Sequence, residues 1–403
     1  MSASSSPRAG AARSPLERLL GSREVVIACG PGGVGKTTTA AAIAATVSVR
    51  TAAKVLVLTV DPARRLADAL GVAGIGNTAS QVPSAAFSAA GVRQKGELWA
   101  AMLDTKQSWD ALVSRHAPDA TTAAQIFANP IYQNITGRFA QSHEYIAMER
   151  LYEIHAEGTY DLVVVDTPPT RDALDFLDAP GRMADFFASG LLRWLVAPAR
   201  SRLVGLASRP FYQVADRILG TQFLGDVTEF FLLFQSMYDG FVSRAQAVGS
   251  LLGDARTTFM LVTTLETVPA VEATRFAAAL ADRRLHLGLL VVNKVLPASL
   301  ADPEAVAVAE ALQGEPAARA RALLAALPGG LAGSSEEMVA RVLAEIGRSF
   351  ASFGLVASRQ RELLAEMSAA HEVTATVPHL ASDVVDLRGL LAIGRHVLEG
   401  SVD

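Results

Sequence analysis

The residues best suited to chemistry lie in one glycine-rich stretch near the amino terminus, 29-CGPGGVGKTTTAAAIA-44. Two motifs overlap in this stretch. Gly30-x-Gly32-x-x-Gly35 satisfies the dinucleotide fingerprint, whereas Gly30-x-x-x-x-Gly35-Lys36-Thr37 satisfies the phosphate-binding loop of nucleoside triphosphate enzymes. A dinucleotide site holds its pyrophosphate with backbone N–H groups and the helix dipole, so it has no need of the lysine and the threonine. The Lys36-Thr37 pair therefore favours the triphosphate interpretation.

In a triphosphate loop the lysine and the threonine have separate tasks. Lys36 would place a positive charge at the β- and γ-phosphates, and the Thr37 hydroxyl would be a ligand of Mg²⁺. Such a site also needs a carboxylate at the end of a buried strand near the metal, and Asp166 ends the apolar run 162-LVVVD-166. We therefore predict that the chain binds ATP and Mg²⁺. The loop residues expected to contact the nucleotide are Gly30, Gly32, Gly33, Val34, Gly35, Lys36, Thr37 and Thr38.

Short apolar runs, each followed by a helical stretch, predict the elements that position these residues. Runs that are buried on both faces and separated by helices are typical of a parallel sheet. We predict an α/β fold with a doubly wound, mostly parallel sheet of the P-loop NTPase type and an inserted helical subdomain. The predicted strands are 25-VVIAC-29, 54-KVLVLTV-60, 98-LWAAML-103, 160-YDLVVVD-166, 258-TFMLVTT-264 and 287-LGLLVVN-293.

The rest of the chain is interpreted as parts of one domain. Residues 1–15 have the composition of a disordered tail, and residues 16–403 show no internal duplication, which indicates a single ATPase-sized unit. Helical segments at about 105–157 and 180–252 are expected to pack together above the sheet. The capping-box start 334-SSEE-337 predicts a long amphipathic helix that reaches about Ala370. The preceding segment, 301–333, is rich in alanine, glycine and proline and is interpreted as a surface excursion.

Charge and cysteine content exclude several classes of protein. The 36 basic and 40 acidic residues give a net charge of −4, which provides no electrostatic field for nucleic acid. No apolar run reaches the roughly 18 residues that a membrane span needs, so we expect no stable membrane insertion. Cys29 is the single cysteine, so an internal disulfide is excluded and a reducing, cytoplasmic compartment is expected.

Five motifs in matching order make the sequence resemble a known family from about residue 16 onward. The chain resembles the arsenical-pump-driving ATPases (ArsA) and, equally, their relatives that deliver tail-anchored membrane proteins. The resemblance implies a dimer that hydrolyses ATP to ADP, that changes conformation with its nucleotide and that acts on a hydrophobic protein client. The motifs are 30-GPGGVGKTTTAAAIA-44, 59-TVDPARRLADAL-70, 166-DTPPTRDALDFL-177, 289-LLVVNKVLP-297 and 377-VPHLASDVVDLRGL-390.

The resemblance also implies roles for residues outside the glycine-rich loop. Asp61 matches the carboxylate that orients the attacking water, and with Asp166 it would contact Mg²⁺ through water. Residues 166–170 match a switch segment that responds to loss of the γ-phosphate. Asn293 matches the residue that hydrogen-bonds the adenine, and Pro378 lies in the segment 377–380 that closes over the base.

The sequence departs from the family pattern at Pro31 and in its cysteines. The family usually has a lysine at this loop position that reaches the partner subunit's nucleotide, and proline has neither that charge nor an N–H group. Arg64, Arg65 or Arg171 could replace the lysine, or a paralogous subunit of a heterodimer could supply it. Because Cys29 stands alone, neither the metalloid site of the arsenical pump nor an intersubunit zinc site of paired cysteines is expected.

Two alternatives remain open for the client site and for the function. The aromatic-rich helical residues 183–241 fit a client groove and an ordinary core equally well, because both have the same amphipathic pattern. The chain could also be a weakly catalytic, nucleotide-binding subunit that pairs with an active paralogue. A positioning ATPase of the same superfamily is a further alternative, although 386-DLRGLLAIGRHVLEG-400 has only three basic residues and is a poor membrane anchor.

Overall fold

The structure is a computed structural model in which the chain is described over ten ranges. These ranges are residues 15–60, 64–72, 74–138, 140–168, 177–179, 181–182, 185, 221–327, 334–399 and 401–402. The predicted tail and most of the segment 183–220 lie outside them.

Over the described ranges the chain forms one sheet of nine strands, in the order β3-β4-β2-β5-β1-β6-β7-β8-β9. All neighbouring pairs are parallel except β3 with β4 and β8 with β9. The predicted α/β class is therefore confirmed, and each of the six predicted runs forms a strand. The strands are β1 (Val25–Cys29), β2 (Lys54–Thr59), β3 (Ser80–Gln81), β4 (Glu97–Met102), β5 (Leu162–Asp166), β6 (Thr257–Thr264), β7 (Leu287–Val295), β8 (Thr374–Pro378) and β9 (Ser401–Val402).

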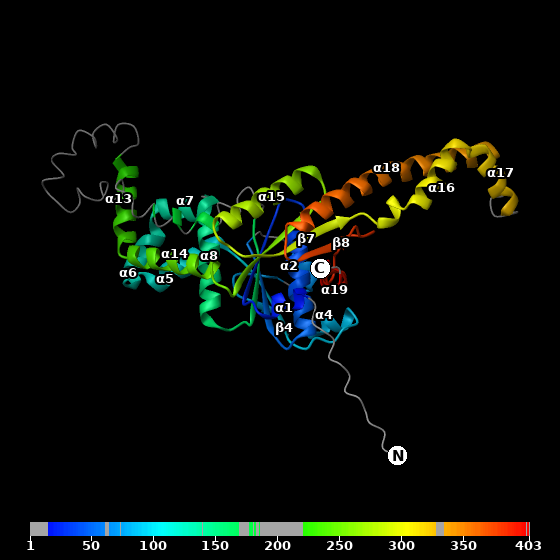
Figure 1. The fold of residues 1–403 in the computed structure, drawn as a ribbon. Coiled ribbons are helices and arrows are strands. Elements are labelled where there is room, and N and C mark those ends of the chain that lie inside the picture. The colour runs from blue at the N-terminus through cyan, green and yellow to red at the C-terminus, as the bar shows by residue number, and fades with distance from the viewer. Residues whose placement is uncertain are drawn as a thin grey trace, which may run out of the picture.

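Helices cover both faces of this sheet (Figure 1). Because successive side chains of a strand point to opposite faces, Val26 and Ala28 join one core while Ile27 joins the other. The first core contains α1 (Pro15–Gly21), α2 (Lys36–Arg50), α3 (Arg64–Leu70), α4 (Ser84–Ala89) and α19 (Leu387–Glu399). The second core contains α5 (Thr105–His116), α6 (Ala120–Ala128), α7 (Pro130–Arg138), α8 (Ala140–Glu157), α13 (Thr221–Gln235), α14 (Tyr238–Leu252) and α15 (Thr267–Asp282). None of the helices in the described ranges combines the length and apolar character that a membrane crossing requires.

Between β7 and β8 the chain forms a helical arm that projects from the sheet (Figure 1). The arm consists of the short 3-10 helix η1 (Ala298–Ala301), α16 (Pro303–Gly314), α17 (Pro316–Ala326) and α18 (Glu336–Ala369). The long helix predicted from the capping box is confirmed, since Ser335 accepts a hydrogen bond from the Met338 N–H. The segment 301–333, interpreted as a surface excursion, belongs to this arm, and its described part forms helices because Pro303 and Pro316 occupy first-turn positions and begin helices there.

Helix α2 is enclosed between the sheet and α19. Ala40, Ala41 and Ala44 are fully buried in this helix. On the α19 side, a Cβ atom added to Gly394 would lie 1.8 Å from Thr46 Oγ1 and 2.8 Å from the Ala42 carbonyl oxygen. Only glycine therefore allows the two helices to pack at this distance, and α2 is held on both sides.

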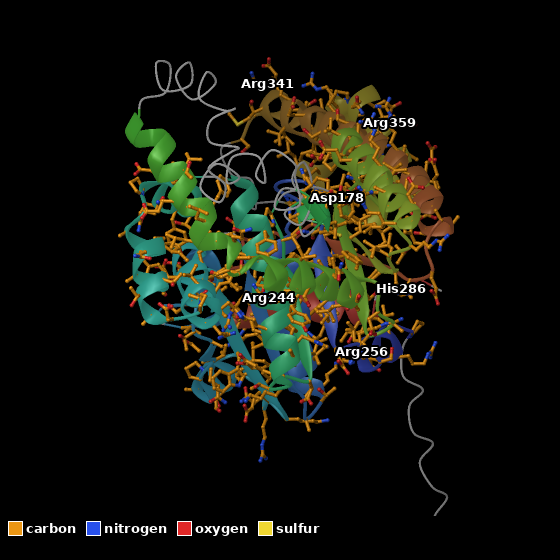
Figure 2. The ribbon with its side chains drawn as sticks, turned by 90° about the vertical axis from the view of Figure 1, so that its left-hand side faces the viewer. Asp178, Arg244, Arg256, His286, Arg341 and Arg359 are labelled. Carbon is orange, nitrogen blue, oxygen red and sulfur yellow. The ribbon has the colours of Figure 1, made fainter. Side chains whose placement is uncertain are left out.

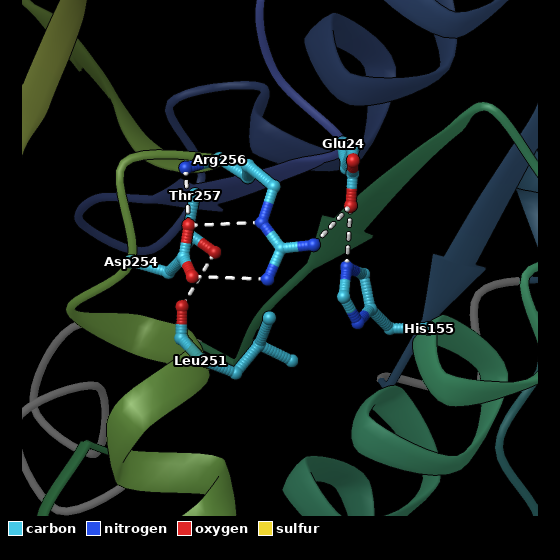
Figure 3. Close-up of polar contacts among 6 residues, drawn as sticks. All are labelled: Glu24, His155, Leu251, Asp254, Arg256 and Thr257. Atoms are coloured by element: carbon cyan, nitrogen blue, oxygen red, sulfur yellow. Dashed lines mark hydrogen bonds and ion pairs between the residues drawn. The ribbon is translucent and has the colours of Figure 1, made fainter.

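The amino ends of β1 and β6 are joined to the helices by a polar cluster (Figure 3). Glu24 contacts His155 of α8 at 2.7 Å and Arg256 at 3.2 Å. Arg256 also donates to Asp254, and these hydrogen bonds lower the pKa of Asp254 to about 2. The cluster lies at the amino ends of the parallel strands, whereas the glycine-rich loop follows the carboxyl end of β1, so the two are on opposite edges of the sheet.

Candidate nucleotide site

The loop of residues 30–35 connects β1 directly to α2. Gly30 has φ +145°, and a Cβ atom there would lie 2.0 Å from the Val262 carbonyl oxygen of β6. Gly35 has φ +96°, and its Cβ atom would lie 2.5 Å from Asn293 Nδ2. Both positions combine a left-handed backbone with a close neighbour, so only glycine fits them. The glycines thus allow the loop to turn tightly against β6 and β7, which it contacts.

Lys36 and Thr37 lie in the first turn of α2. The Lys36 side chain is buried, and its Nζ donates to the Pro31 carbonyl oxygen at 2.8 Å. The first-turn N–H groups of a helix and its dipole favour an anion at this end. The predicted phosphate-binding residues are therefore brought together at a helix amino terminus, with a lysine folded over the loop.

Asp166 lies beside this turn at the carboxyl end of β5. Its Oδ2 accepts a hydrogen bond from Thr37 Oγ1 at 2.6 Å and one from Thr59 Oγ1 at 3.1 Å. The contact follows from the strand order, because β5 lies between β1 and β2 and all three are parallel. A threonine hydroxyl next to a carboxylate is an all-oxygen donor set, which is the kind that Mg²⁺ prefers. The residues present therefore fit a magnesium ion held by Thr37 directly and by Asp166 through water.

Asn293 contacts the loop from β7. Its Nδ2 donates to the Val34 carbonyl oxygen at 2.8 Å, and its Oδ1 accepts from the Lys294 N–H at 2.9 Å. Each of these atoms keeps one further hydrogen-bonding position, because an amide nitrogen has two protons and an amide oxygen has two lone pairs. The adenine contact of Asn293 remains a prediction, and the structure adds a second role in holding the loop.

Lys294 is a residue of the site that the sequence analysis missed. Its Nζ donates to the Gly33 carbonyl oxygen at 3.2 Å, and its φ of +59° is unusual for a residue other than glycine. Such a conformation is kept where surrounding contacts over-determine it. The signal available in the sequence was a lysine directly after Asn293, at the end of a buried strand.

Pro378 lies close to these residues at the end of β8. It pairs with Val295, and the following His379 N–H donates to the Val295 carbonyl oxygen at 2.8 Å. The ends of β7 and β8 therefore bring Pro378 to the same edge of the sheet as Asn293. Pro378 is the last residue of β8, so the segment 377–380 begins within the strand.

The predicted catalytic residue Asp61 and the alternative cation Arg171 lie outside the described residues. Arg64 and Arg65 are described only as the first residues of α3. The chain leading to Asp61 is nevertheless anchored at the site, because the Val60 N–H donates to the Asp166 carbonyl oxygen at 3.1 Å. Thr167 in turn donates to the Ala28 carbonyl oxygen at 2.8 Å. The segment that leads to Asp61 and the switch segment 166–170 therefore both start beside Asp166.

This arrangement agrees with the comparison with known proteins. The sequence model of the ArsA ATPases, described as anion-transporting ATPases, matches residues 23–315. The chain belongs to the ArsA ATPase family. The match includes the loop, Asp166 and Asn293, whereas Pro378 lies beyond it. The chain is thus a nucleotide-binding ATPase, and the predicted recognition is confirmed.

Individual relatives of this ArsA ATPase are distant. An ATPase ASNA1 homolog of Entamoeba dispar is 25% identical over 289 residues, which cover 70% of this chain and 80% of that protein. An ATPase ASNA1 homolog of Entamoeba histolytica is also 25% identical, over 292 residues, with the same two shares. An uncharacterized protein of Streptomyces coelicolor is 30% identical over 269 residues, which cover 66% of this chain and 61% of that protein.

The aromatic helices α13 and α14 are largely core where the structure describes them. Phe230, Phe234 and Phe241 are buried, and Phe241 lies against Trp109 and Tyr145 with ring centroids 6.2 and 6.0 Å apart. Of the two interpretations of 183–241, the core interpretation is therefore confirmed for these aromatic residues of α13 and α14. The stretch 186–197, which carried part of the groove interpretation, lies outside the described residues.

A buried ionic network joins α5, α8 and α14 beneath these rings. Glu149 is ion-paired with Arg244 and accepts a hydrogen bond from Tyr145 at 2.8 Å (Figure 2 marks Arg244). Burial raises the pKa of Glu149, and the nearby Arg244 charge opposes that shift. Within the described ranges, His116, Glu149 and Glu153 are the group whose ligand atoms lie close enough to hold a metal ion. Arginines already pair with both glutamates, Arg115 contacting Glu153 at 2.5 Å, so the group is better explained as a helix-joining network.

Proposed function

We propose that the chain hydrolyses ATP with Mg²⁺ and that its nucleotide state acts on a protein client as part of a dimer. The observation that carries the proposal is the contact of Thr37 Oγ1 with Asp166 Oδ2 at 2.6 Å, beside the buried Lys36. Lys36 stabilises charge on the phosphates, Thr37 and Asp166 hold the metal, and Asp61 orients the attacking water. Mg²⁺, when bound, neutralises charge that develops on the transferred phosphoryl group.

Coupling to the helices would run through the second core. Ile27 of β1 and Val165 of β5 lie next to the site in sequence and pack in the same core as Tyr145 and Phe241. A packed core transmits displacements because it has few voids to absorb them. A change in the segment after Asp166 would therefore reach α8 and α14, and through them a client bound to the helical layer.

A pair of substitutions tests the assignment of the site. Lys36→Ala should remove measurable nucleotide binding, whereas Asp61→Asn should retain binding and lower turnover by about 100-fold or more. Lys95→Ala, an exposed lysine away from the loop, is the matched control and should change neither quantity. Binding is measured by calorimetry with ADP and ATP, and turnover by phosphate release. Hydrolysis by Asp61→Asn at the parental rate would show that another group orients the water.

The client is tested separately from the hydrolysis. The Asp61→Asn chain, which should stay in its ATP state, is used to capture proteins from the source cells, with Lys36→Ala as the control. Proteins that carry an apolar segment should be enriched on Asp61→Asn only. Equal capture by both variants would contradict the client proposal and leave the ATPase assignment untouched.

A further inference from the structure

Helix α18 exposes more large hydrophobic side chains than any other described element. Val342, Ile346 and Phe353 are 53%, 51% and 55% exposed. Of the exposed large hydrophobic residues in the described ranges, half lie on this helix: Met338, Val342, Ile346, Phe353, Leu355 and Val356. A concentration of exposed apolar surface on one element indicates an interaction site, whereas single exposed residues do not.

The exposed stripe is not the face by which the arm holds itself together. A Cβ atom on Gly347 would lie 2.6 Å from the Ala309 carbonyl oxygen, and one on Gly354 would lie 2.7 Å from that of Leu300. These glycines and the buried Ala357 form the face that packs on α16 and η1. The stripe lies beside that face and lines a groove of about 420 Å³ together with Leu300 and Phe350.

The spacing of the apolar residues in the stripe indicates which kind of partner fits it. Val342, Ile346, Ser349, Phe353 and Val356 follow one another at intervals of four, three, four and three residues. This alternation keeps side chains on the seam of a left-handed coiled coil, so the shape that fits the stripe is another long helix. With 34 residues, α18 is about 50 Å long, and the seam from Val342 to Val356 occupies about 21 Å of it.

We propose that the stripe on α18 binds α18 of a second copy of this chain in an antiparallel pair centred near residue 351. In this register Phe353 of one copy lies opposite Ser349 of the other, so that a large side chain enters the space left by a small one. Ile346 lies opposite Val356. A two-fold pairing of this kind uses the same patch on both copies and closes without forming a chain of subunits.

The charges beside the seam agree with the same register. Glu345 and Arg359 flank the stripe on one side, and the antiparallel pair brings Glu345 of each copy near Arg359 of the other (Figure 2 marks Arg341 and Arg359). Opposite charges at these positions favour the pairing, and like charges oppose it. Because the pair is two-fold symmetric, each copy contributes one Glu345 and one Arg359, and two equivalent Glu345–Arg359 contacts form.

The surface is separate from the nucleotide site. The arm begins after β7 and extends away from the helical layer of α5–α8, so pairing through α18 needs neither nucleotide nor client (Figure 1). The inference therefore stands without the proposed function. To keep the two distinguishable, the experiments use the nucleotide-free Lys36→Ala chain.

Site-directed crosslinking tests the register. Ser352→Cys is about one residue from the centre, so the two introduced thiols are close along the axis, whereas Ser358→Cys thiols would be about 21 Å apart along it. A short bismaleimide should crosslink the first variant into a covalent dimer and not the second. Cys29 is buried and burial raises the pKa of its thiol, so it gives little background. Equal crosslinking of both variants, or none of either at about 100 μM protein, overturns the proposal.

Charge exchange tests the pairing without altering the fold. Glu345→Arg and Arg359→Glu should each weaken the dimer about tenfold in sedimentation equilibrium, and the double variant should return to within about threefold of the parent. Phe353→Glu, at an exposed position, should give monomers that keep the parental circular-dichroism spectrum. If neither single charge variant changes the dissociation constant, the proposal fails. Capture of a different protein by the stripe, with the chain monomeric alone, contradicts the second copy as the occupant.

Discussion

At the scale of single residues, the loop is held from β7 by two neighbouring side chains. Asn293 bonds the Val34 carbonyl oxygen, and Lys294 bonds that of Gly33. Each contact holds a peptide carbonyl group of the loop in a fixed orientation. The phosphate site is therefore shaped by a strand that is distant in sequence, in addition to its own glycines.

Lys294→Met should weaken binding of ADP about tenfold, because a hydrogen bond from a charged donor contributes about 1.5–3 kcal/mol and only part of it bears on the ligand. Methionine keeps the length of the side chain and removes the ammonium group. Calorimetry with ADP measures the change, and Lys95→Met is the control. Retention of parental affinity by Lys294→Met would show that the Asn293 contact alone shapes the loop.

The residues of the site differ in how well they could be predicted. Lys36, Thr37 and Asp166 follow from the motif and from a strand end, since their chemistry requires those types at that spacing. Lys294 did not follow, because an exposed lysine after a strand is common. Only the parallel pairing of β1, β6 and β7 brings it to the loop.

At the scale of elements, the Glu149–Arg244 pair ties α8 to α14. Glu149 is almost fully buried, and the Arg244 side chain is 14% exposed. A buried carboxylate that loses its partner keeps its desolvation cost, so the helices depend on the pair even where the pair itself adds little net stability. The packing of the helical layer is therefore sensitive to one charge.

Arg244→Met should lower the free energy of unfolding by about 3 kcal/mol, because it leaves Glu149 buried without its counter-charge. The additional Glu149→Gln substitution should recover more than half of that loss. Urea denaturation measures both. Arg115→Met is the matched control, since Arg115 is half-exposed and its pair with Glu153 should contribute less than about 1 kcal/mol. A similar loss for both arginine variants would contradict the special role of Arg244.

The elements that could be predicted are those whose pattern is set by burial on both faces. The central strands read as continuous apolar runs, and α18 is marked by its capping residue Ser335. β3 and β9 have only two residues each, and β8 is polar at Thr374 and Thr376, so none of the three has such a run. Helices α16 and α17 were missed because their prolines mark helix starts as readily as breaks.

At the scale of the whole molecule, Pro31 separates this chain from the usual family pattern. Its carbonyl oxygen accepts a hydrogen bond from the Lys36 ammonium at 2.8 Å, and the proline side chain carries no positive charge. A homodimer would lack the cross-subunit lysine at both sites. A heterodimer with a lysine-bearing paralogue would supply it at the site on this chain.

Mixing this chain with such a paralogue should raise its turnover by about 10³-fold, as a cation supplied in trans does at a developing phosphoryl charge. Pro31→Lys should raise the activity of the chain alone. Pro31→Ala is the control that removes the proline without adding charge, and it should leave the rate low. Phosphate release is compared for the chain, the paralogue and an equimolar mixture. Full activity of the chain alone, with no gain on mixing, would favour Arg64, Arg65 or Arg171 as the cation.

The enclosure of α2 between the sheet and α19 also determines when the nucleotide site can be completed during synthesis. More than 300 residues separate the end of α2 from the start of α19. At roughly 5–20 residues per second, the ribosome needs tens of seconds to make that stretch. Throughout this time the face of α2 that packs on α19, at Ala42 and Thr46, has no helix to cover it, and β6 and β7 are also made long after the loop that they contact. The part of the nascent chain that binds phosphate is thus made early and assembled late, so its apolar surface stays uncovered in the interval.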